Sequence, residues 1–240
     1  MAVALLLALL LQLCHSERSL GPGRGEWVHE PPERQGLDSQ ALADAGALLG
    51  NAVPHRYCFT VVKGGAIVHD QYFGKNTSSS KYRTQSLGKS MVATMIGTLV
   101  QKGLLDLDVP LQHYGVKPGE GGGGKEGSWN LTGIDFYPNV TARHLLSQAS
   151  GYGKVPPGTM FTYDSYYFIQ HLSALIRAVT GMSPTRYARE AYGEPMGMPD
   201  LFDYDGYIYD IGDDISISGG QMMTCRDVAR VGQLLLNNGS

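Results

Sequence analysis

The sequence predicts an α+β fold in which a β-hairpin precedes a long helical region. Two β-rich runs, at residues 57–63 and 66–73, are separated only by Gly64 and Gly65, a spacing typical of a two-residue hairpin turn. From Ser86 onward, apolar residues recur every three or four positions, as they do on one face of a helix. Because a stable sheet needs about three strands or more, we expect the chain to stop before its sheet is complete.

Length and composition exclude several classes of protein. The 240 residues are enough for one domain, or for one domain built as two lobes, with a real hydrophobic core. A hydrophobic fraction of 42% and a charged fraction of 17% exclude disordered, collagenous and coiled-coil chains. The 19 basic residues are balanced by 22 acidic residues, so nucleic acid is not expected as a partner.

The first 16 residues resemble a secretory signal peptide. Their apolar run from Ala2 to Leu13 is too short to span a bilayer but has the length of a signal-peptide core. We expect cleavage after Ser16, which would remove Cys14 and leave no stable membrane anchor. The protein is therefore expected to be secreted or to lie in the lumen of the secretory pathway.

Acceptor sites for N-linked glycosylation agree with this destination. The Asn-x-Ser/Thr pattern occurs at Asn76, Asn130, Asn139 and Asn238. The composition would produce about one such site by chance, so the four sites indicate a glycoprotein. After cleavage Cys58 and Cys225 remain, and the sequence leaves open whether they pair.

Composition divides the rest of the chain into a linker and a folded domain. Residues 17–36 are rich in glycine, proline and charge and are expected to form a linker, whereas 37–240 form the domain. Residues 117–127 contain four consecutive glycines and are expected to be a surface loop. Helices are expected from Asp38 or Ser39 to Gly50, from Ser86 to Gly103, from Thr141 to Gly151, over about 165–180, from Ser183 and from Thr224.

A Ser-x-x-Lys motif begins the most apolar of these helices. The spacing of three residues between Ser86 and Lys89 places both side chains on one helix face, about 5–6 Å apart at Cβ. Burial would favour the neutral amine, which could then accept the serine proton, and the helix N-terminus would stabilise an oxyanion. The pattern also occurs at Ser78 and Lys81, but in a polar loop with no apolar helix behind it.

A tyrosine motif supplies a second candidate for proton transfer. Tyr163 and Ser165 form a Tyr-x-Ser triplet between a turn-rich segment and a long apolar helix. A competing triplet begins at Tyr137, but its third residue, Asn139, belongs to a glycosylation acceptor. With 14 tyrosines in the chain, such triplets also arise by chance, so the motif alone decides little.

Taken in order, four segments resemble the serine β-lactamase and penicillin-binding-protein superfamily. The similar branch contains class C β-lactamases, carboxylesterases and 6-aminohexanoate-oligomer hydrolases. The segments are QSLGKSMVATMIGTLVQKGLLDLDVPL, VTARHLLSQASGYG, PPGTMFTYDSYYFIQHLSALIRAVTGMSPTRYARE with EPMGM, and ISISGGQMMTCRDVARVGQLLLNNG. The resemblance implies a β-lactamase/transpeptidase-like fold, an antiparallel sheet flanked by helices, with a helical lobe at about 86–205 and the C-terminal strands missing.

The resemblance also assigns roles to individual residues. Ser86 would be the acylated nucleophile and one oxyanion donor through its backbone N–H, Lys89 its general base, and Tyr163 the proton relay. Ser165 stands where class C β-lactamases usually have asparagine. A serine at this position is similar to the esterases and oligomer hydrolases. The implied activity is therefore cleavage of a small ester or amide, without a cofactor, rather than β-lactam hydrolysis.

The third motif of that superfamily, Lys-Ser/Thr-Gly or His-x-Gly, is absent after Tyr163. The last lysine is Lys154, and the only later histidine, His171, lies in a predicted helix. Two hypotheses therefore stand: an active secreted serine hydrolase, or a non-catalytic truncated remnant or pseudoenzyme.

Metal-site patterns are not convincing. The seven histidines form neither His-x-His nor His-Glu-x-x-His, and the acidic stretch at 203–214 lacks the register of an EF-hand. We therefore expect no metal ion, and the oligomeric state stays open.

Overall fold

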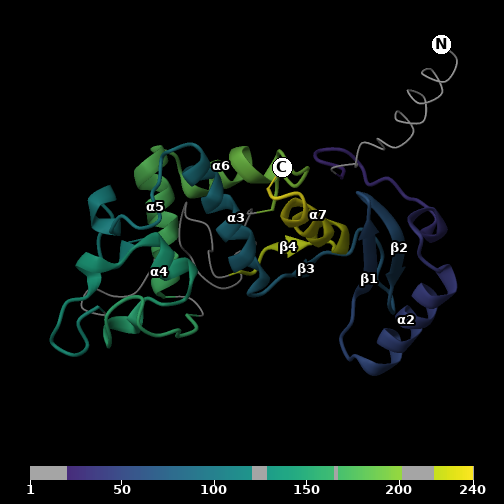
Figure 1. The fold of residues 1–240 in the computed structure, drawn as a ribbon, viewed down its shortest axis with the longest axis horizontal. Helices are drawn as coiled ribbons and strands as arrows, with labels where there is room; N and C mark the ends of the chain where they lie inside the picture. Colours follow the sequence, from purple (N-terminus) through teal and green to yellow (C-terminus); the bar gives the residue numbers. More distant parts are fainter. Residues whose placement is uncertain (1–20, 121–128, 165–166, 202–218, 240) are drawn as a thin grey trace, which may run out of the picture. The chain divides into compact units, whose positions relative to one another are not determined.

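The computed structural model describes residues 21–120, 129–164, 167–201 and 219–239. They belong to two compact units, the first comprising residues 1–80 and 224–240 and the second residues 81–223. The elements of both units are drawn in Figure 1. Helices and small antiparallel sheets together confirm the α+β class.

Next to its turn, the hairpin of unit 1 has the register that the turn predicts, and the register shifts between Val61 and Val62. Strands β1 (Cys58–Lys63) and β2 (Ala66–Tyr72) pair antiparallel, with Lys63 opposite Ala66. Gly64 and Gly65 both have positive φ, 60° and 80°, which a type I′ turn requires at both central positions.

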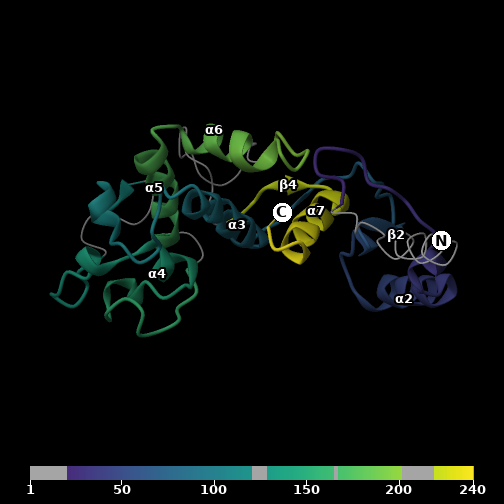
Figure 2. The ribbon, with the colours of Figure 1, turned by 45° about the horizontal axis from the view of Figure 1, so that its top comes forward.

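Helices α2 (Ser39–Ala52) and α7 (Cys225–Leu236) cover opposite faces of this hairpin (Figures 1 and 2). Asp70 and Gln71 are adjacent in β2, so their side chains point to opposite faces of the sheet. Asp70 pairs with Arg226 of α7, with 2.7 Å between Oδ2 and Nη2. Gln71 packs on Gly46 of α2, where a Cβ would lie only 1.9 Å from the amide oxygen of Gln71. A glycine therefore allows α2 to lie close to the strand.

The segment that composition predicted to be a linker is packed in its described part. Trp27 is buried, and its indole N–H donates to a backbone carbonyl of α7 at 3.2 Å. Ile67 of β2 exchanges backbone hydrogen bonds with Val28 and Glu30, at 2.9 and 3.0 Å. A 3₁₀ turn, η1 (Pro32–Gln35), follows. Gly and Pro indicate turns, but one buried tryptophan anchors the segment.

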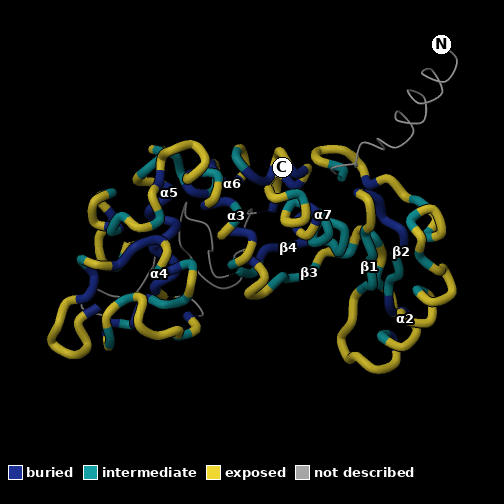
Figure 3. The backbone as a smooth tube through the Cα atoms, viewed as in Figure 1, coloured by how far each residue is buried: buried dark blue, intermediate teal, exposed yellow. Residues whose placement is uncertain are grey.

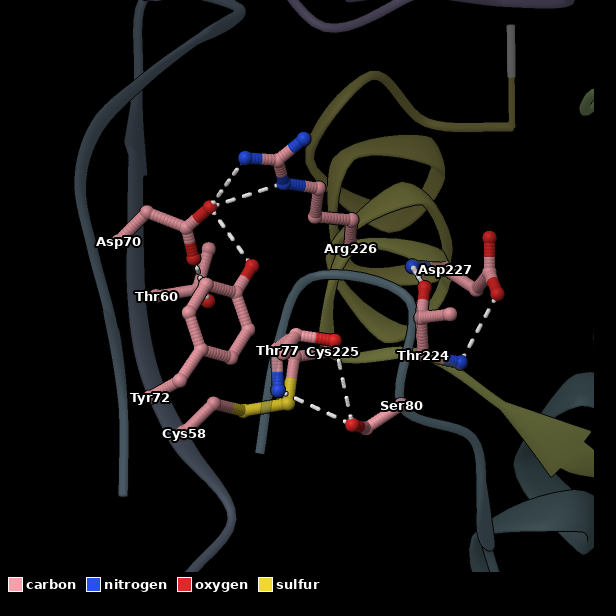
Figure 4. Close-up of a disulfide and its surroundings, with 10 residues drawn as sticks. All are labelled: Cys58, Thr60, Asp70, Tyr72, Thr77, Ser80, Thr224, Cys225, Arg226 and Asp227. Atoms are coloured by element: carbon pink, nitrogen blue, oxygen red, sulfur yellow. Dashed lines mark hydrogen bonds and ion pairs between the residues drawn. A yellow bond between two sulfur atoms is a disulfide. The ribbon is translucent and has the colours of Figure 1, made fainter. Parts of the chain in front are cut away.

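Cys58 and Cys225, whose pairing the sequence left open, form a disulfide between β1 and α7 (Figure 4). Beside it, Asp70 accepts hydrogen bonds from Thr60 at 2.8 Å and from Tyr72 at 2.7 Å, as well as pairing with Arg226. The same face of the hairpin is thus joined to α7 by one covalent and several polar links.

In unit 2 the predicted periodicity becomes helix α3 (Leu87–Gln101), whose inner face is the core of the unit. Five apolar side chains are fully buried there: Met91, Val92, Met95, Ile96 and Leu99. On the same helix Thr94 and Thr98 hydrogen bond to Tyr192 and Tyr187, at 2.8 and 2.6 Å. These tyrosines come from the π-helical η7 (Arg189–Gly193) and from α6 (Pro184–Ala188).

Other helices of unit 2 begin where their caps predict but have different lengths. Thr141 and Ser183 cap α4 (Ala142–Leu146) and α6, each accepting a hydrogen bond from the backbone three residues on. Helix α4 ends before the predicted Gly151, because the chain turns left-handed at Gln148. Helix α5 (His171–Thr180) starts later than 165 and follows η6 (Phe168–Gln170). The buried inner stretches of α3 and α5 are dark blue in Figure 3.

Short elements complete the second unit. Strands β3 (Tyr82–Arg83) and β4 (Met222–Met223) pair antiparallel. Three further 3₁₀ turns are η2 (Leu111–Tyr114), η4 (Tyr137–Asn139) and η5 (Gly151–Gly153). None of the helices in the described ranges has both the length and the apolar character to cross a membrane.

Candidate active site

Ser86 occupies the N-terminal end of α3. It is the N-cap residue, its side chain is exposed, and Lys89 stands on the first turn of the helix. The side-chain nitrogen of Lys89 donates a hydrogen bond of 3.3 Å to the Ser86 hydroxyl oxygen. The spacing of three residues therefore brings the two side chains together, as the sequence predicted.

Tyr163 reaches the same oxygen from a distant part of unit 2. Its phenolic O–H donates to Ser86 Oγ across a sequence separation of 77 residues. The Lys89 Nζ atom also lies 5.1 Å from the centroid of the Tyr163 ring. Lys89 and Tyr163, predicted from two separate motifs, thus converge on Ser86 Oγ.

The surroundings change the acidity of Tyr163. Its hydrogen bond to Ser86, and then its interactions with Lys89, lower the pKa of the phenol below its ordinary value. Half of the Tyr163 surface is exposed. A phenol with a lowered pKa next to a serine hydroxyl can exchange a proton with it more readily.

The expected burial of the motif is not what this structure shows. One face of α3 is buried, beginning at Gly88, but Ser86 is exposed and Lys89 is only half-buried. The contacts of Lys89 with Ser86 and Tyr163, rather than removal from water, define its environment.

Two glycines let a second chain segment lie against the start of α3. A Cβ on Gly88 would lie 2.1 Å from the side-chain oxygen of Gln221 and 2.5 Å from the Cα atom of Gly219. A Cβ on Gly219 would lie 1.8 Å from the carbonyl oxygen of Gln85. Gln85 itself has a φ of 49°, a strained conformation for a residue other than glycine, directly before Ser86. The sequence prediction missed these contacts, although Gly-Gly at 219–220 was a visible signal.

A buried carboxylate next to Tyr163 was also missed. Asp164 is 2% exposed and accepts backbone N–H groups from Tyr167 at 2.8 Å and Ile169 at 2.6 Å. The hydroxyl of Tyr152 donates to it at 3.1 Å. Burial, and then the charge of Asp164, raises the pKa of Tyr152. An acidic residue shortly before a helical stretch is the signal that could have revealed these hydrogen bonds to the backbone.

The competing tyrosine has a structural place. Tyr137 is buried, and its hydroxyl donates to the carbonyl of Val116 at 2.6 Å. Burial raises the pKa of Tyr137, which disfavours its ionisation. Tyr163 is therefore the better candidate.

The remaining predicted sites are tested less directly. Ser165 lies outside the described residues, as do the acidic stretch at 203–214 and most of the glycine-rich loop. Of the acceptor asparagines, Asn130, Asn139 and Asn238 are exposed, and Asn76 is half-exposed. Within the described ranges, no three His, Cys, Asp or Glu side chains are grouped as a metal ion would require.

Comparison with known proteins identifies the family. Residues 40–240 match the family described as Beta-lactamase. The chain belongs to the β-lactamase family. No curated protein matches its sequence significantly.

Solved structures similar to this β-lactamase-family chain show the same fold. The octameric penicillin-binding protein homologue from Pyrococcus abyssi has a TM-score of 0.60 and 20% identity, over 85% of this chain and 57% of its own. A Bacillus anthracis protein classed as a 6-aminohexanoate-dimer hydrolase has a TM-score of 0.56 and 18% identity, over 93% and 66%. The D-stereospecific amidohydrolase from Streptomyces sp. has a TM-score of 0.57 and 17% identity, over 83% and 73%.

These similarities define the architecture of the chain. Its fold is the β-lactamase/transpeptidase-like fold that the resemblance predicted. The chain spans 66% and 57% of the lengths of the Bacillus and Pyrococcus proteins.

Proposed function

We propose that this member of the β-lactamase family is a serine hydrolase that cleaves an ester or amide through an acyl-enzyme on Ser86. The convergence of Lys89 and Tyr163 on the Ser86 hydroxyl oxygen carries the proposal. A hydroxyl is a weak nucleophile, and a neighbouring base is the usual means of activating it.

Each proton has a place in the proposed reaction. Ser86 Oγ attacks the carbonyl carbon while its proton passes to the neutral amine of Lys89, which acts as general base; Tyr163 gives its phenolic proton to the departing oxygen or nitrogen and is reprotonated by Lys89. The product alcohol or amine leaves, and the acyl group stays bound to Oγ. Water then attacks the acyl carbon, gives up a proton through the same relay and releases a carboxylic acid, which restores Ser86.

Oxyanion stabilisation would come in part from the start of α3. The backbone N–H of Ser86 lies at the positive end of the helix, where the charge of the tetrahedral intermediate would develop. The sequence offers no third motif after Tyr163 to supply a second donor. Loss of one donor costs on the order of 10²–10³ in rate, so the alternative is a non-catalytic member that lacks the second donor.

We further propose a secreted glycoprotein that acts on a small-molecule ester or amide and needs no cofactor. The N-terminal apolar run and the exposed acceptor asparagines support secretion. The Cys58–Cys225 disulfide also supports it, since disulfides persist in oxidising compartments and are rare in the cytosol.

A fluorophosphonate probe, which labels activated serines covalently, tests the proposal on the intact chain. We expect one adduct in the intact mass of the wild type and none in Ser86→Ala. Ser78→Ala is the matched control, because Ser78 has the same Ser-x-x-Lys spacing in a polar loop. It should keep the adduct. Since Ser78 also completes the acceptor at Asn76, all masses are compared after removal of N-linked glycans.

Two results would contradict the proposal. A folded wild-type chain that forms no adduct would favour the non-catalytic alternative. An adduct that survives Ser86→Ala would place the reactive serine elsewhere.

A further inference from the structure

One residue holds the backbone on both sides of Tyr163. The carbonyl oxygen of Gln148 accepts the N–H of Thr162 at 2.8 Å. The side-chain oxygen of the same glutamine accepts the N–H of Asp164 at 2.5 Å. Gln148 therefore hydrogen bonds to the residue before Tyr163 and to the residue after it.

Gln148 adopts a conformation that its own residue type disfavours. Its φ is 57°, in the left-handed region, just beyond the end of α4. Helices commonly end in this conformation, but the residue is usually glycine or asparagine, because a longer side chain adds strain. A glutamine here accepts this backbone strain, but its side chain is long enough to reach the Asp164 amide.

Asp164, the residue after Tyr163, is also fixed through its side chain. The buried carboxylate of Asp164 is held by the backbone of Tyr167 and Ile169 and by the hydroxyl of Tyr152. With its amide bound to Gln148 and its carboxylate bound to the start of η6, Asp164 has little freedom to rotate. The main chain of Tyr163 is thus constrained from α4 and from η6, while its side chain extends to Ser86.

We propose that Gln148 is a positioning residue that holds Tyr163 at hydrogen-bond distance from Ser86 and Lys89. The inference rests on the proposed function of Ser86 and adds a residue that no motif assigns. Geometry of this kind matters because a misplacement of about 1 Å can lower a rate on the order of 10²-fold.

Gln148→Met is the most direct test, since methionine keeps the length of the side chain but has no comparable acceptor for the Asp164 amide. We expect the rate of Ser86 labelling, or kcat for a small ester, to fall about 10- to 100-fold, with KM changed less than twofold. Thr98→Val is the matched control, because it removes the hydrogen bond to Tyr187 without touching Tyr163. It should lower stability while leaving the rate unchanged.

Gln148→Gly separates positioning from folding. Glycine relieves the left-handed backbone and keeps the carbonyl that binds Thr162, so the variant should be folded and as stable as Gln148→Met or more so. We expect it to be as slow as Gln148→Met. A wild-type rate in either variant would overturn the proposal.

A second readout needs no turnover. Tyrosine labelled with ¹³C at Cζ is titrated by NMR, with the signal of Tyr163 assigned from Tyr163→Phe. The groups that face the phenol of Tyr163 are Ser86, Lys89 and the adjacent Asp164. Contact with Ser86 and Lys89 lowers the pKa of the phenol. We expect Gln148→Met to raise that pKa toward its ordinary value.

An unchanged titration of Tyr163 would overturn the positioning role, whether or not the chain hydrolyses anything. Conversely, a raised pKa of Tyr163 in Gln148→Met, in a chain that the probe does not label, would support the positioning role of Gln148 while contradicting the proposed hydrolase. The two failures are therefore distinguishable.

Discussion

At the scale of single residues, the candidate site depends on the absence of a side chain at Gly88. This glycine lies between Ser86 and Lys89, and the segment at 219–221 packs directly on it. The nearest atoms include the backbone of Gly219, which cannot swing aside as a flexible side chain can. The position of the helix start, and hence of Ser86, is tied to this contact.

We predict that Gly88→Ala displaces the segment at 219–221 and lowers both stability and the rate of Ser86 labelling. Overpacking of this kind costs about 1–3 kcal/mol. Gly97→Ala is the control on the same helix, because a Cβ there would meet no atom within 4 Å. Since alanine is the better helix former, Gly97→Ala should raise stability by about 0.5–1 kcal/mol and leave labelling unchanged.

Chemical denaturation with probe labelling of both variants checks this pair of effects. Equal free energies of unfolding for Gly88→Ala and Gly97→Ala would show that the approach of the second segment is looser than the structure indicates.

At the scale of elements, local signals predicted more than long-range ones. The hairpin followed from two glycines between β-rich runs, and α3 from the spacing of its apolar residues. The pair Ser86 and Lys89 needed only helical geometry. Tyr163 could not be placed by spacing, because 77 residues separate it from Ser86. Its predicted partnership came from the family resemblance, and the structure supplies the contact.

The errors at this scale share one cause. Helix lengths and packing faces depend on tertiary contacts that a periodic pattern does not contain. In α2 the apolar Leu48 is 70% exposed, whereas Gly46 is buried against Gln71 of β2 and Gly50 against Phe73. Because Gly46 has no side chain, β2 can lie close to α2, and the hydropathy pattern cannot reveal this contact.

We predict that the link between the hairpin and α7 depends on Asp70. Its carboxylate is 9% exposed and binds Arg226, Tyr72 and Thr60, so Asp70→Asn would leave a partly buried guanidinium without its counter-charge (Figure 4). We expect a loss of about 3 kcal/mol in the free energy of unfolding. Burial, and then its hydrogen bond to Asp70, raises the pKa of Tyr72 to about 12, and this pKa should fall in the variant.

The exposed ion pair of Asp108 with Arg143 provides the comparison. Its geometry is similar, with 2.5 Å between Nε and Oδ1, but both side chains are more than half exposed. Asp108→Asn should therefore change stability very little. Equal losses in the two variants, measured by urea denaturation, would show that the Asp70 network adds nothing beyond a surface pair.

At the scale of the whole molecule, the chain order makes one unit an insertion in the other. Unit 1 contains both 21–80 and 224–239 among its described residues, and unit 2 lies between them in sequence. The disulfide joins the two pieces of unit 1 across 167 positions. Closing so long a loop stabilises a folded chain by up to about 5 kcal/mol in the chain-entropy model, so this one bond carries much of the assembly of unit 1.

The stability of unit 2 should depend on pH through His171. This histidine is fully buried in α5; its Nε2 accepts the N–H of Gly119 at 3.1 Å, so the proton must be on Nδ1, which lies 2.9 Å from the carbonyl of Phe168. Protonation of Nε2 would place two donors face to face. Burial accordingly lowers the pKa of His171 to about 4.

The direction of the effect follows from which state binds the proton. Above about pH 7.5 His171 is almost entirely neutral in both the folded and the unfolded chain and has almost no influence on the pH dependence. As the pH falls from about 6.5 to about 4, the unfolded chain takes up a proton that the folded chain refuses, so stability decreases by about 3 kcal/mol. His171→Gln should remove this slope because glutamine can accept from Gly119 and does not titrate. His113→Gln, at an exposed histidine, should retain it. Equilibrium unfolding of the three proteins between pH 4 and 7 measures the slopes directly, and a His171→Gln slope equal to that of the wild type would show that another group governs the acid sensitivity of the core.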